Sequence, residues 1–276
     1  MEKNVKIAVL DLYDGQPNQG MRCIKEILKN YEGVAETKVF DLRGKHEFPE
    51  MDHDIFICSG GPGNPLEGDG IWDKEFYKLI QNLWLWNKKI DSNKNEKKKH
   101  VFFICHSFQM ACQMFGIGKI TKRYSKSFGI FPVHKTKEGQ LEVLFQNLSD
   151  PFYVADFRDY QVISPDEEKI ADLGAKIIAR EKIRPDVDFE RAIMAVRFSE
   201  EFFGVQFHPE ADPDGMLDHF AKEENKKKIV DEHGLAKFEQ MMDDLKDPER
   251  IQKTYIELIP KFIEDAIGLL KGACVR

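Results

Sequence analysis

The chain has 276 residues, of which 32% are charged, and its formal net charge is −7. It lacks the basic excess that is typical of general nucleic-acid binders, and no apolar run reaches the roughly 18 residues that a membrane-spanning helix needs. The first residues do not resemble a signal peptide, so we expect a cytoplasmic protein whose partners include neither nucleic acid nor a membrane. The length suits one large α/β domain, or a domain of roughly 200 residues with an extension.

The first half of the chain alternates short apolar runs with segments of helical periodicity. The predicted strands are the apolar runs at 5–10, 34–42, 55–58 and 101–105. The predicted helices lie around 24–28, at 71–86 and at 107–115. Strands that alternate with helices in this order predict a mostly parallel central sheet with helices on both faces.

The middle of the chain has a different pattern. Between 119 and 178, short runs such as 130–134 and 141–144 are separated by turn-like residues, which indicates antiparallel strands or hairpins added to the sheet. Two further strands are predicted at 192–198 and 202–207, with a tight connection between them.

The character changes again after residue 211. The segment 212–246 is strongly charged, and 251–270 places its apolar residues on one helical face. We therefore predict a catalytic domain over 1–211 and a charged helical extension over 212–276. The final helix either packs on its own domain, which is the commoner arrangement, or offers a surface to a partner.

The five cysteines are widely spaced and odd in number: Cys23, Cys58, Cys105, Cys112 and Cys274. No C-x-x-C pair is present, so the sequence predicts neither a zinc site nor a thioredoxin-like motif, and no other spacing implies a metal or an organic cofactor. In a reducing compartment most of these side chains are free thiols. We expect one reactive thiol among several buried, inert ones.

One cysteine lies between a predicted strand and a predicted helix, in the segment Phe103-Ile104-Cys105-His106-Ser107-Phe108-Gln109. A residue at such a turn projects its side chain above the sheet. The following helix offers free N–H groups and the positive end of its dipole, which favour a thiolate, the nucleophilic form of the side chain. These features fit a catalytic nucleophile; the competing interpretation is a buried structural cysteine.

A second motif is His208-Pro209-Glu210. Proline favours an extended conformation for the residue before it, and residues two apart in an extended segment point the same way. Glu210 can then accept from one ring nitrogen of His208 and leave the other nitrogen free to take a thiol proton. The competing interpretation is a surface turn.

A third motif is the glycine-rich segment Ser59-Gly60-Gly61-Pro62-Gly63-Asn64-Pro65, which follows a predicted strand. Glycines allow backbone N–H groups to approach a ligand closely, and two such donors form an oxyanion hole. A phosphate-binding loop is disfavoured because no G-x-x-x-x-G-K-[ST] pattern is present. A plain tight turn is the remaining alternative.

Together the three motifs resemble those of the class I (triad) glutamine amidotransferases, where S-G-G-P-G, G-x-C-x-G-x-Q and H-P-E follow in this order. The segment Gly204-Val205-Gln206-Phe207-His208-Pro209-Glu210 is a highly specific match, and 128–133 is similar to a further family segment. The resemblance extends over residues 5 to 211 and is to glutaminase domains like that of GMP synthase. It implies an α/β, flavodoxin-like fold.

The resemblance also implies a role for each matching residue. Cys105 attacks the γ-carboxamide carbon of glutamine, His208 acts as general base and then as general acid, and Glu210 orients His208. The remaining matches are the oxyanion donors and the glutamine-binding residues: the backbone N–H groups of His106 and Gly61, then Gln109 and Gly63. The products are glutamate and ammonia, formed through a thioester without a cofactor.

The chain departs from the family pattern in three respects. The two glycines of G-x-C-x-G, here called the elbow glycines, are replaced by Phe103 and Ser107, which implies different packing at a strained turn. Phe108 stands where many relatives have a polar residue. Arg158 and Asp159 stand where relatives usually have small residues and a histidine that contact the glutamine. These two residues affect the prediction of the substrate more than the prediction of the reaction type. The side chain of His106 is a second base or, as we expect, only flanks the pocket.

Four functions are compatible with these features. The first is a glutaminase that feeds ammonia to a separate synthetase subunit, since this chain carries no ATP-binding motif. The second is a free-standing hydrolase of γ-glutamyl amides or peptides that uses the same triad. Acyl transfer to an amino-acid hydroxyl and a non-catalytic or redox-sensing α/β protein are the others. The last needs the cysteine but not His-Pro-Glu, so the full triad counts against it.

Overall fold

The computed structural model describes residues 5–16, 18–90, 96–186 and 188–272, and a nine-stranded mixed sheet forms its centre. The strands in chain order are β1 (Val5–Asp11), β2 (Ala35–Asp41), β3 (Ile55–Cys58), β4 (His100–Ile104), β5 (Lys119–Lys135), β6 (Phe152–Ile163), β7 (Lys176–Glu181), β8 (Ile193–Arg197) and β9 (Phe202–Val205). The helices are α1 (Gln19–Lys29), α2 (Trp72–Ile90), α3 (His106–Met114), α4 (Lys137–Gln140), the short 3₁₀ helix η1 (Val143–Phe145), α5 (Glu167–Leu173), α6 (Pro213–Ala221), α7 (Glu223–His233), α8 (Leu235–Lys246) and α9 (Ile251–Gly272).

The sheet has a parallel half and an antiparallel half. Its spatial order is β2-β1-β3-β4-β9-β8-β7-β5-β6. The strands from β2 to β9 pair in parallel, and every pairing from β9 to β6 is antiparallel. The central parallel strands β3, β4 and β9 are buried along their whole length, which is expected when helices cover both faces. The predicted α/β, flavodoxin-like class is confirmed.

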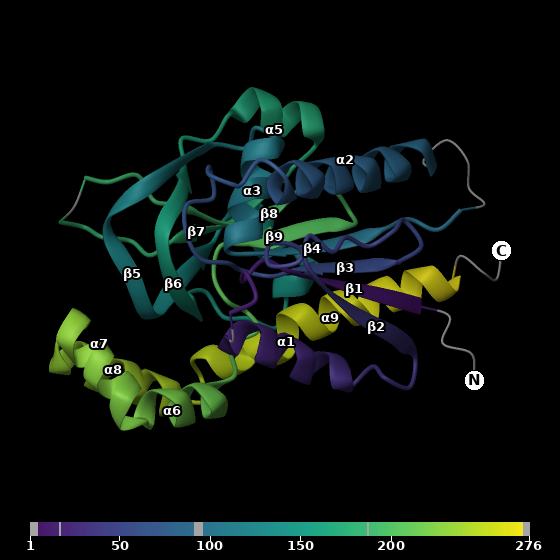
Figure 1. Cartoon of the computed structure of the whole chain (residues 1–276). Helices are drawn as coiled ribbons and strands as arrows, with labels where there is room; N and C mark the ends of the chain where they lie inside the picture. Colours follow the sequence, from purple (N-terminus) through teal and green to yellow (C-terminus); the bar gives the residue numbers. More distant parts are fainter. Residues whose placement is uncertain (1–4, 17, 91–95, 187, 273–276) are drawn as a thin grey trace.

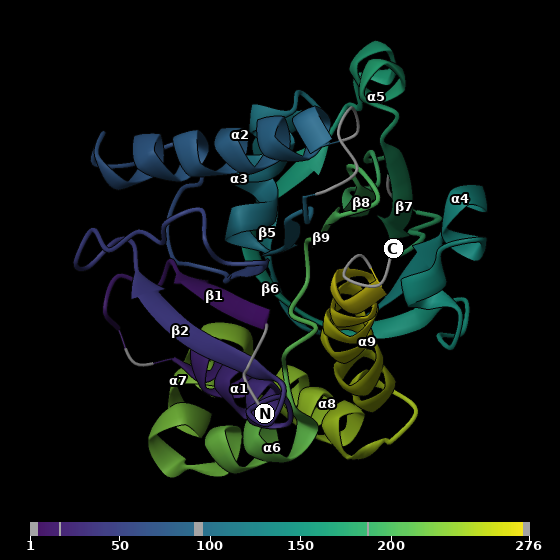
Figure 2. The ribbon, with the colours of Figure 1, turned by 90° about the vertical axis from the view of Figure 1, so that its right-hand side faces the viewer.

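Helices cover both faces of the sheet (Figures 1 and 2). Helices α2, α3 and α5 bury one apolar cluster against one face, and α1 and α9 bury a second cluster against the other. Several helices start at a side-chain cap: the side chain of Asn18, for example, accepts a hydrogen bond from the backbone N–H of Met21 and so caps α1. The carboxyl ends of the parallel strands remain open, which is where sheets of this kind bind ligands.

One predicted strand is wrong. The run 141–144 connects α4 to η1 and supplies the first residues of η1, whereas the run 130–134 does lie in β5. Side-chain caps explain the difference: Thr136 Oγ1 accepts from Gly139 N at 3.0 Å, and a Glu142 oxygen accepts from Leu144 N at 3.2 Å. These local bonds favour tight helical turns over an extended strand.

The residues after 211 form two parts. Helices α6, α7 and α8 lie beside β5 and β6 (Figure 1), where they bury a third apolar cluster. Helix α9 instead returns to the sheet and packs in the main core, with Leu258, Ile259 and Ile263 fully buried. The division into a domain over 1–211 and an extension over 212–276 stays a proposal, and within it α9 packs on the main core.

Candidate active site

Cys105 lies at the turn between β4 and α3, at the open end of the parallel strands. Its φ of 49° and ψ of −96° are unusual for a residue other than glycine, and such strained geometry persists only when the surroundings hold it. The backbone N–H of Cys105 donates to the Val205 carbonyl at 2.9 Å, and the Gln109 N–H donates to the Cys105 carbonyl at 3.0 Å. The thiol therefore sits at the N-terminus of a buried helix, where a thiolate is stabilised.

The two replaced elbow glycines are compensated elsewhere in the structure. Phe103 pairs with Gly204 on β9, and a Cβ added at Gly204 would lie 3.1 Å from the Phe103 Cβ and 2.9 Å from a Phe108 ring carbon. The space that the family pattern provides at position 103 is thus provided by the neighbouring strand. Ser107 Oγ donates to the Cys58 carbonyl at 2.8 Å and accepts from Ile104 N at 2.9 Å, so it ties the turn to β3.

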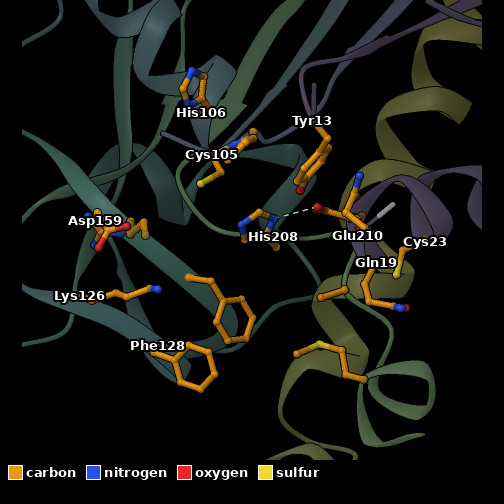
Figure 3. Close-up of a pocket in the computed structure, with 18 of the residues that line it drawn as sticks. Tyr13, Gln19, Cys23, Cys105, His106, Lys126, Phe128, Asp159, His208 and Glu210 are labelled. Carbon is orange, nitrogen blue, oxygen red and sulfur yellow. Dashed lines mark hydrogen bonds and ion pairs between the residues drawn. The ribbon is translucent and has the colours of Figure 1, made fainter. Parts of the chain in front are cut away.

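His208 and Glu210 follow β9 and lie beside this turn. The His208 N–H donates to the Ala155 carbonyl at 2.9 Å, which fixes the backbone against β6. The Nδ1 of His208 lies 2.8 Å from Oε1 of Glu210, whose side chain is 1% exposed. Figure 3 shows the His208 ring between Cys105 and Glu210.

The charge state of His208 is set by two opposing effects. Burial by itself lowers its pKa, but the Glu210 carboxylate and the Cys105 sulfur, which also shares a hydrogen bond with it, raise the pKa well above its ordinary value. The effects of these two partners on the pKa of His208 therefore outweigh the effect of burial. A protonated imidazole beside a deprotonated thiol is the reactive form of a cysteine nucleophile.

The glycine-rich loop approaches the same atoms. A Cβ added at Gly60 would lie 3.0 Å from His208 Cε1 and 3.6 Å from the Cys105 Cβ, and one added at Gly61 would lie 2.6 Å from the Leu12 carbonyl oxygen. A side chain at Gly61 would therefore require a shift of the backbone, and one at Gly60 would press on the His208 ring and the Tyr13 hydroxyl. Arg43 supports the loop by donating to the Pro62 carbonyl at 2.8 Å.

All seven predicted site residues line one pocket of about 480 Å³. They are Gly61, Gly63, Cys105, His106, Gln109, His208 and Glu210. Sequence reasoning missed the other parts of its wall. Tyr13 and Gln19 come from the start of the chain, and Met216 and Phe220 come from α6. No motif and no periodicity in the sequence marked these four residues.

Two of the predicted residues, Gln109 and His106, have buried side chains. Gln109 Nε2 donates to the Tyr160 carbonyl at 3.0 Å and to Gln206 Oε1 at 3.1 Å. Burial lowers the pKa of His106 to about 4, so its ring is neutral at ordinary pH. This agrees with a flanking side chain and disfavours a second base, which works best with a pKa near the operating pH.

Arg158 and Asp159 differ from each other in position. Arg158 is 4% exposed, and its guanidinium binds Asp156 at 2.8 Å and Glu181 at 3.4 Å. Its charge is therefore matched by acidic partners beneath the pocket. Asp159 is exposed at the rim, across from Lys126 on β5. Of these two departures from the family pattern, the carboxylate of Asp159 is the one that faces solvent.

The other cysteines in the described part of the chain are poor nucleophiles. Burial raises the pKa of Cys58 and Cys112 well above the ordinary thiol value and that of Cys23 to about 12. Cys274 lies outside the described residues. Cys105, at the strained turn, therefore differs in its surroundings from Cys23, Cys58 and Cys112, whose burial disfavours the thiolate.

Two absences apply to the described residues only. No group of three or more His, Cys, Asp or Glu side chains in the described ranges could hold a metal ion. None of the helices over those ranges combines the length and the apolar character needed to cross a bilayer.

The family model for class-I glutamine amidotransferases matches residues 9–226. The chain belongs to this family. No curated protein matches it in sequence. The extent of the match includes the cysteine turn, the His-Pro-Glu segment and the start of the residues after 211, so the family assignment spans the whole pocket.

Solved structures agree with this family member in fold. A glutamine amidotransferase from Thermotoga maritima is 16% identical with a TM-score of 0.61, over 95% of this chain and 98% of that one. One from Methylobacillus flagellatus is 15% identical with a TM-score of 0.59, over 98% and 95%. The glutaminase domain of CTPS from Trypanosoma brucei is 16% identical with a TM-score of 0.53, over 75% and 86%. At these identities the likeness shows the fold alone.

Proposed function

We propose that this amidotransferase hydrolyses the side-chain amide of glutamine through a Cys105 thioester. The observation that carries the proposal is the strained Cys105 turn beside a buried His208–Glu210 pair, with the glycine loop a few ångströms away. Nucleophile, base and orienting carboxylate in this arrangement form the triad of thiol acyl-transfer enzymes.

The proposed reaction has two steps. The Cys105 thiolate attacks the amide carbon, and the backbone N–H groups of His106 and Gly61 hold the oxyanion. The carbon–nitrogen bond then breaks as protonated His208 gives its proton to the leaving amine. In the second step water, deprotonated by His208, attacks the thioester and releases glutamate. Glu210 keeps the ring oriented and charged, and Gly63 and Gln109 contribute to the glutamine site.

The fate of the ammonia is part of the proposal. The CTPS neighbour is a glutaminase domain, and a glutaminase of this kind supplies ammonia to a synthetase, here a separate subunit. A second candidate is a free-standing hydrolase of γ-glutamyl amides or peptides. The apolar wall that α6 adds to the pocket favours this second candidate, because ammonia as a leaving group makes no use of it. The cytoplasmic location stays a prediction.

The test is glutamate release from L-glutamine by the purified chain. Cys105→Ala should abolish it, whereas Cys112→Ala, on the same helix but outside the pocket, should keep it. Thermal unfolding of both variants controls for folding. Equal loss in both variants, or no release by the wild type even with cell extract as a source of partner, would contradict the proposal.

A further inference from the structure

The pocket continues past the triad to a wall of aromatic side chains. This aromatic wall consists of Phe128 from β5, Phe157 from β6 and Phe220 from α6. The ring centroids of Phe128 and Phe157 are 5.0 Å apart, and the Phe220 ring lies 6.4 Å and 6.3 Å from the other two. Met216 of α6 also lines the pocket and is 4% exposed.

The rings of the aromatic wall are not fully buried between the helices and the sheet. Ile130, Met241 and Ile251 do bury a cluster between the helices and the sheet. Phe128, Phe157 and Phe220 remain half-buried and face the pocket, so part of each ring stays available. Apolar walls of this kind, with a few polar groups at one end, are typical of small-molecule sites, and about 480 Å³ is more space than a primary amide needs.

The wall lies on the leaving-group side of the site. The Phe157 ring centroid is 6.2 Å from that of His208, and both residues belong to segments joined by the Ala155–His208 bridge. His208 is the group that protonates the departing nitrogen. A substituent on that nitrogen therefore extends past His208 towards Phe157 and Phe128. Figure 3 shows Phe128 across the pocket from Tyr13.

We propose that the aromatic wall binds an apolar group of aromatic size on the leaving nitrogen, so that the same site also hydrolyses N-substituted γ-glutamyl amides. The inference rests on the proposed thiol chemistry at Cys105. The sulfur forms a thioester as the carbon–nitrogen bond breaks, and the amine leaves with the proton of His208. Water then cleaves the thioester, so one γ-glutamyl amide and one water give one glutamate and one amine.

The experiment compares three substrates with the full chain: L-glutamine, γ-L-glutamyl-methylamide and γ-L-glutamyl-benzylamide. Because burial of a phenyl ring is favourable, kcat/KM for the benzylamide should exceed that for the methylamide by roughly 10- to 100-fold. A benzylamide that is turned over no faster than the methylamide would overturn the inference. Turnover of glutamine in that case would leave the proposed function standing, and no turnover of any substrate would overturn both.

Variants assign the preference to the wall. Phe220→Ala should lower the benzylamide-to-methylamide ratio of kcat/KM by roughly 10-fold, since it removes one ring of the subsite. Phe220→Leu, which keeps apolar volume between α6 and the sheet, should lower the ratio less. Phe189→Ala removes a 62% exposed ring outside the pocket and should leave the ratio unchanged. An unchanged ratio in folded Phe220→Ala would contradict the assignment.

Discussion

The two halves of the pocket are built in different ways. The reactive half lies at the ends of parallel strands, where short contiguous segments carry Cys105 and the His208–Glu210 pair. The other half is assembled from Phe128, Phe157 and Phe220, which lie on two antiparallel strands and a later helix. The comparison indicates that the reacting groups lie in short sequence motifs. Recognition of the leaving group depends instead on tertiary contacts between segments that are distant in the sequence.

The largest expected effect is in the reactive half. His208→Ala should lower kcat/KM for every substrate by about 10⁴-fold, because the thiol loses its base and the leaving amine its acid. Steady-state kinetics with glutamine and both substituted amides measures it. If the loss differed strongly between substrates, the division into a reactive half and a recognition half would fail.

A smaller effect, with a pH signature, is expected for Glu210→Gln. We expect a loss of about 10²-fold at neutral pH, because the ring is less well oriented and its positive charge less stabilised. Glu210 raises the pKa of His208, whereas burial lowers it. Removal of the carboxylate charge therefore lowers that pKa, and the basic limb of the kcat/KM profile should move to lower pH. A basic limb that stays in place would contradict the role of Glu210.

The glycine loop gives a third test of the reactive half. Gly61→Ala places a Cβ 2.6 Å from the Leu12 carbonyl oxygen, so the loop must shift away from the oxyanion position. Activity should fall by roughly 10- to 100-fold, as for the weakening of one oxyanion donor. Gly33→Ala, where nothing lies within 4 Å, is the matched control and should keep full activity. Similar losses in both variants would argue against the loop as a donor.

The smallest effect is expected where α6 joins the rest of the molecule. Asp212 caps α6 at Gly215 and pairs with Arg22 of α1, so Asp212→Ala should lower the free energy of unfolding by about 1 kcal/mol. Asp166→Ala removes the equivalent cap of α5, which lies away from the pocket. Denaturant unfolding should show similar losses for both variants, but only Asp212→Ala should also change the benzylamide-to-methylamide ratio.

The sequence indicates which residues of the reactive half lie together, and it does so for a physical reason. A cysteine between a strand and a helix, and a histidine two residues before a glutamate, are local patterns whose geometry follows from backbone conformation. The aromatic wall depends on β5 and β6 pairing at Phe128 and Phe157 and on α6 packing beside them. No local sequence pattern indicates these contacts between distant segments.

The replaced elbow glycines show the same limit on a smaller scale. Phe103 and Ser107 suggest crowding when they are considered alone. The relief comes from Gly204, which is 101 positions away and adjacent only because β4 and β9 pair. The strand predicted at 141–144 is wrong for a local reason. The side-chain caps at Thr136 and Glu142 favour helical turns there in spite of the apolar run.

Covalent labelling tests the central claim most directly. A chloroketone analogue of glutamine should alkylate the native protein once, and peptide mapping should place the label on Cys105. Excess glutamine should slow the labelling, and peptide mapping of Cys105→Ala should find no label on Cys23, Cys58 or Cys112, because burial raises the pKa values of these three thiols. Labelling of native protein at another cysteine, or equal labelling of Cys105→Ala, would contradict the assignment of Cys105 as the nucleophile.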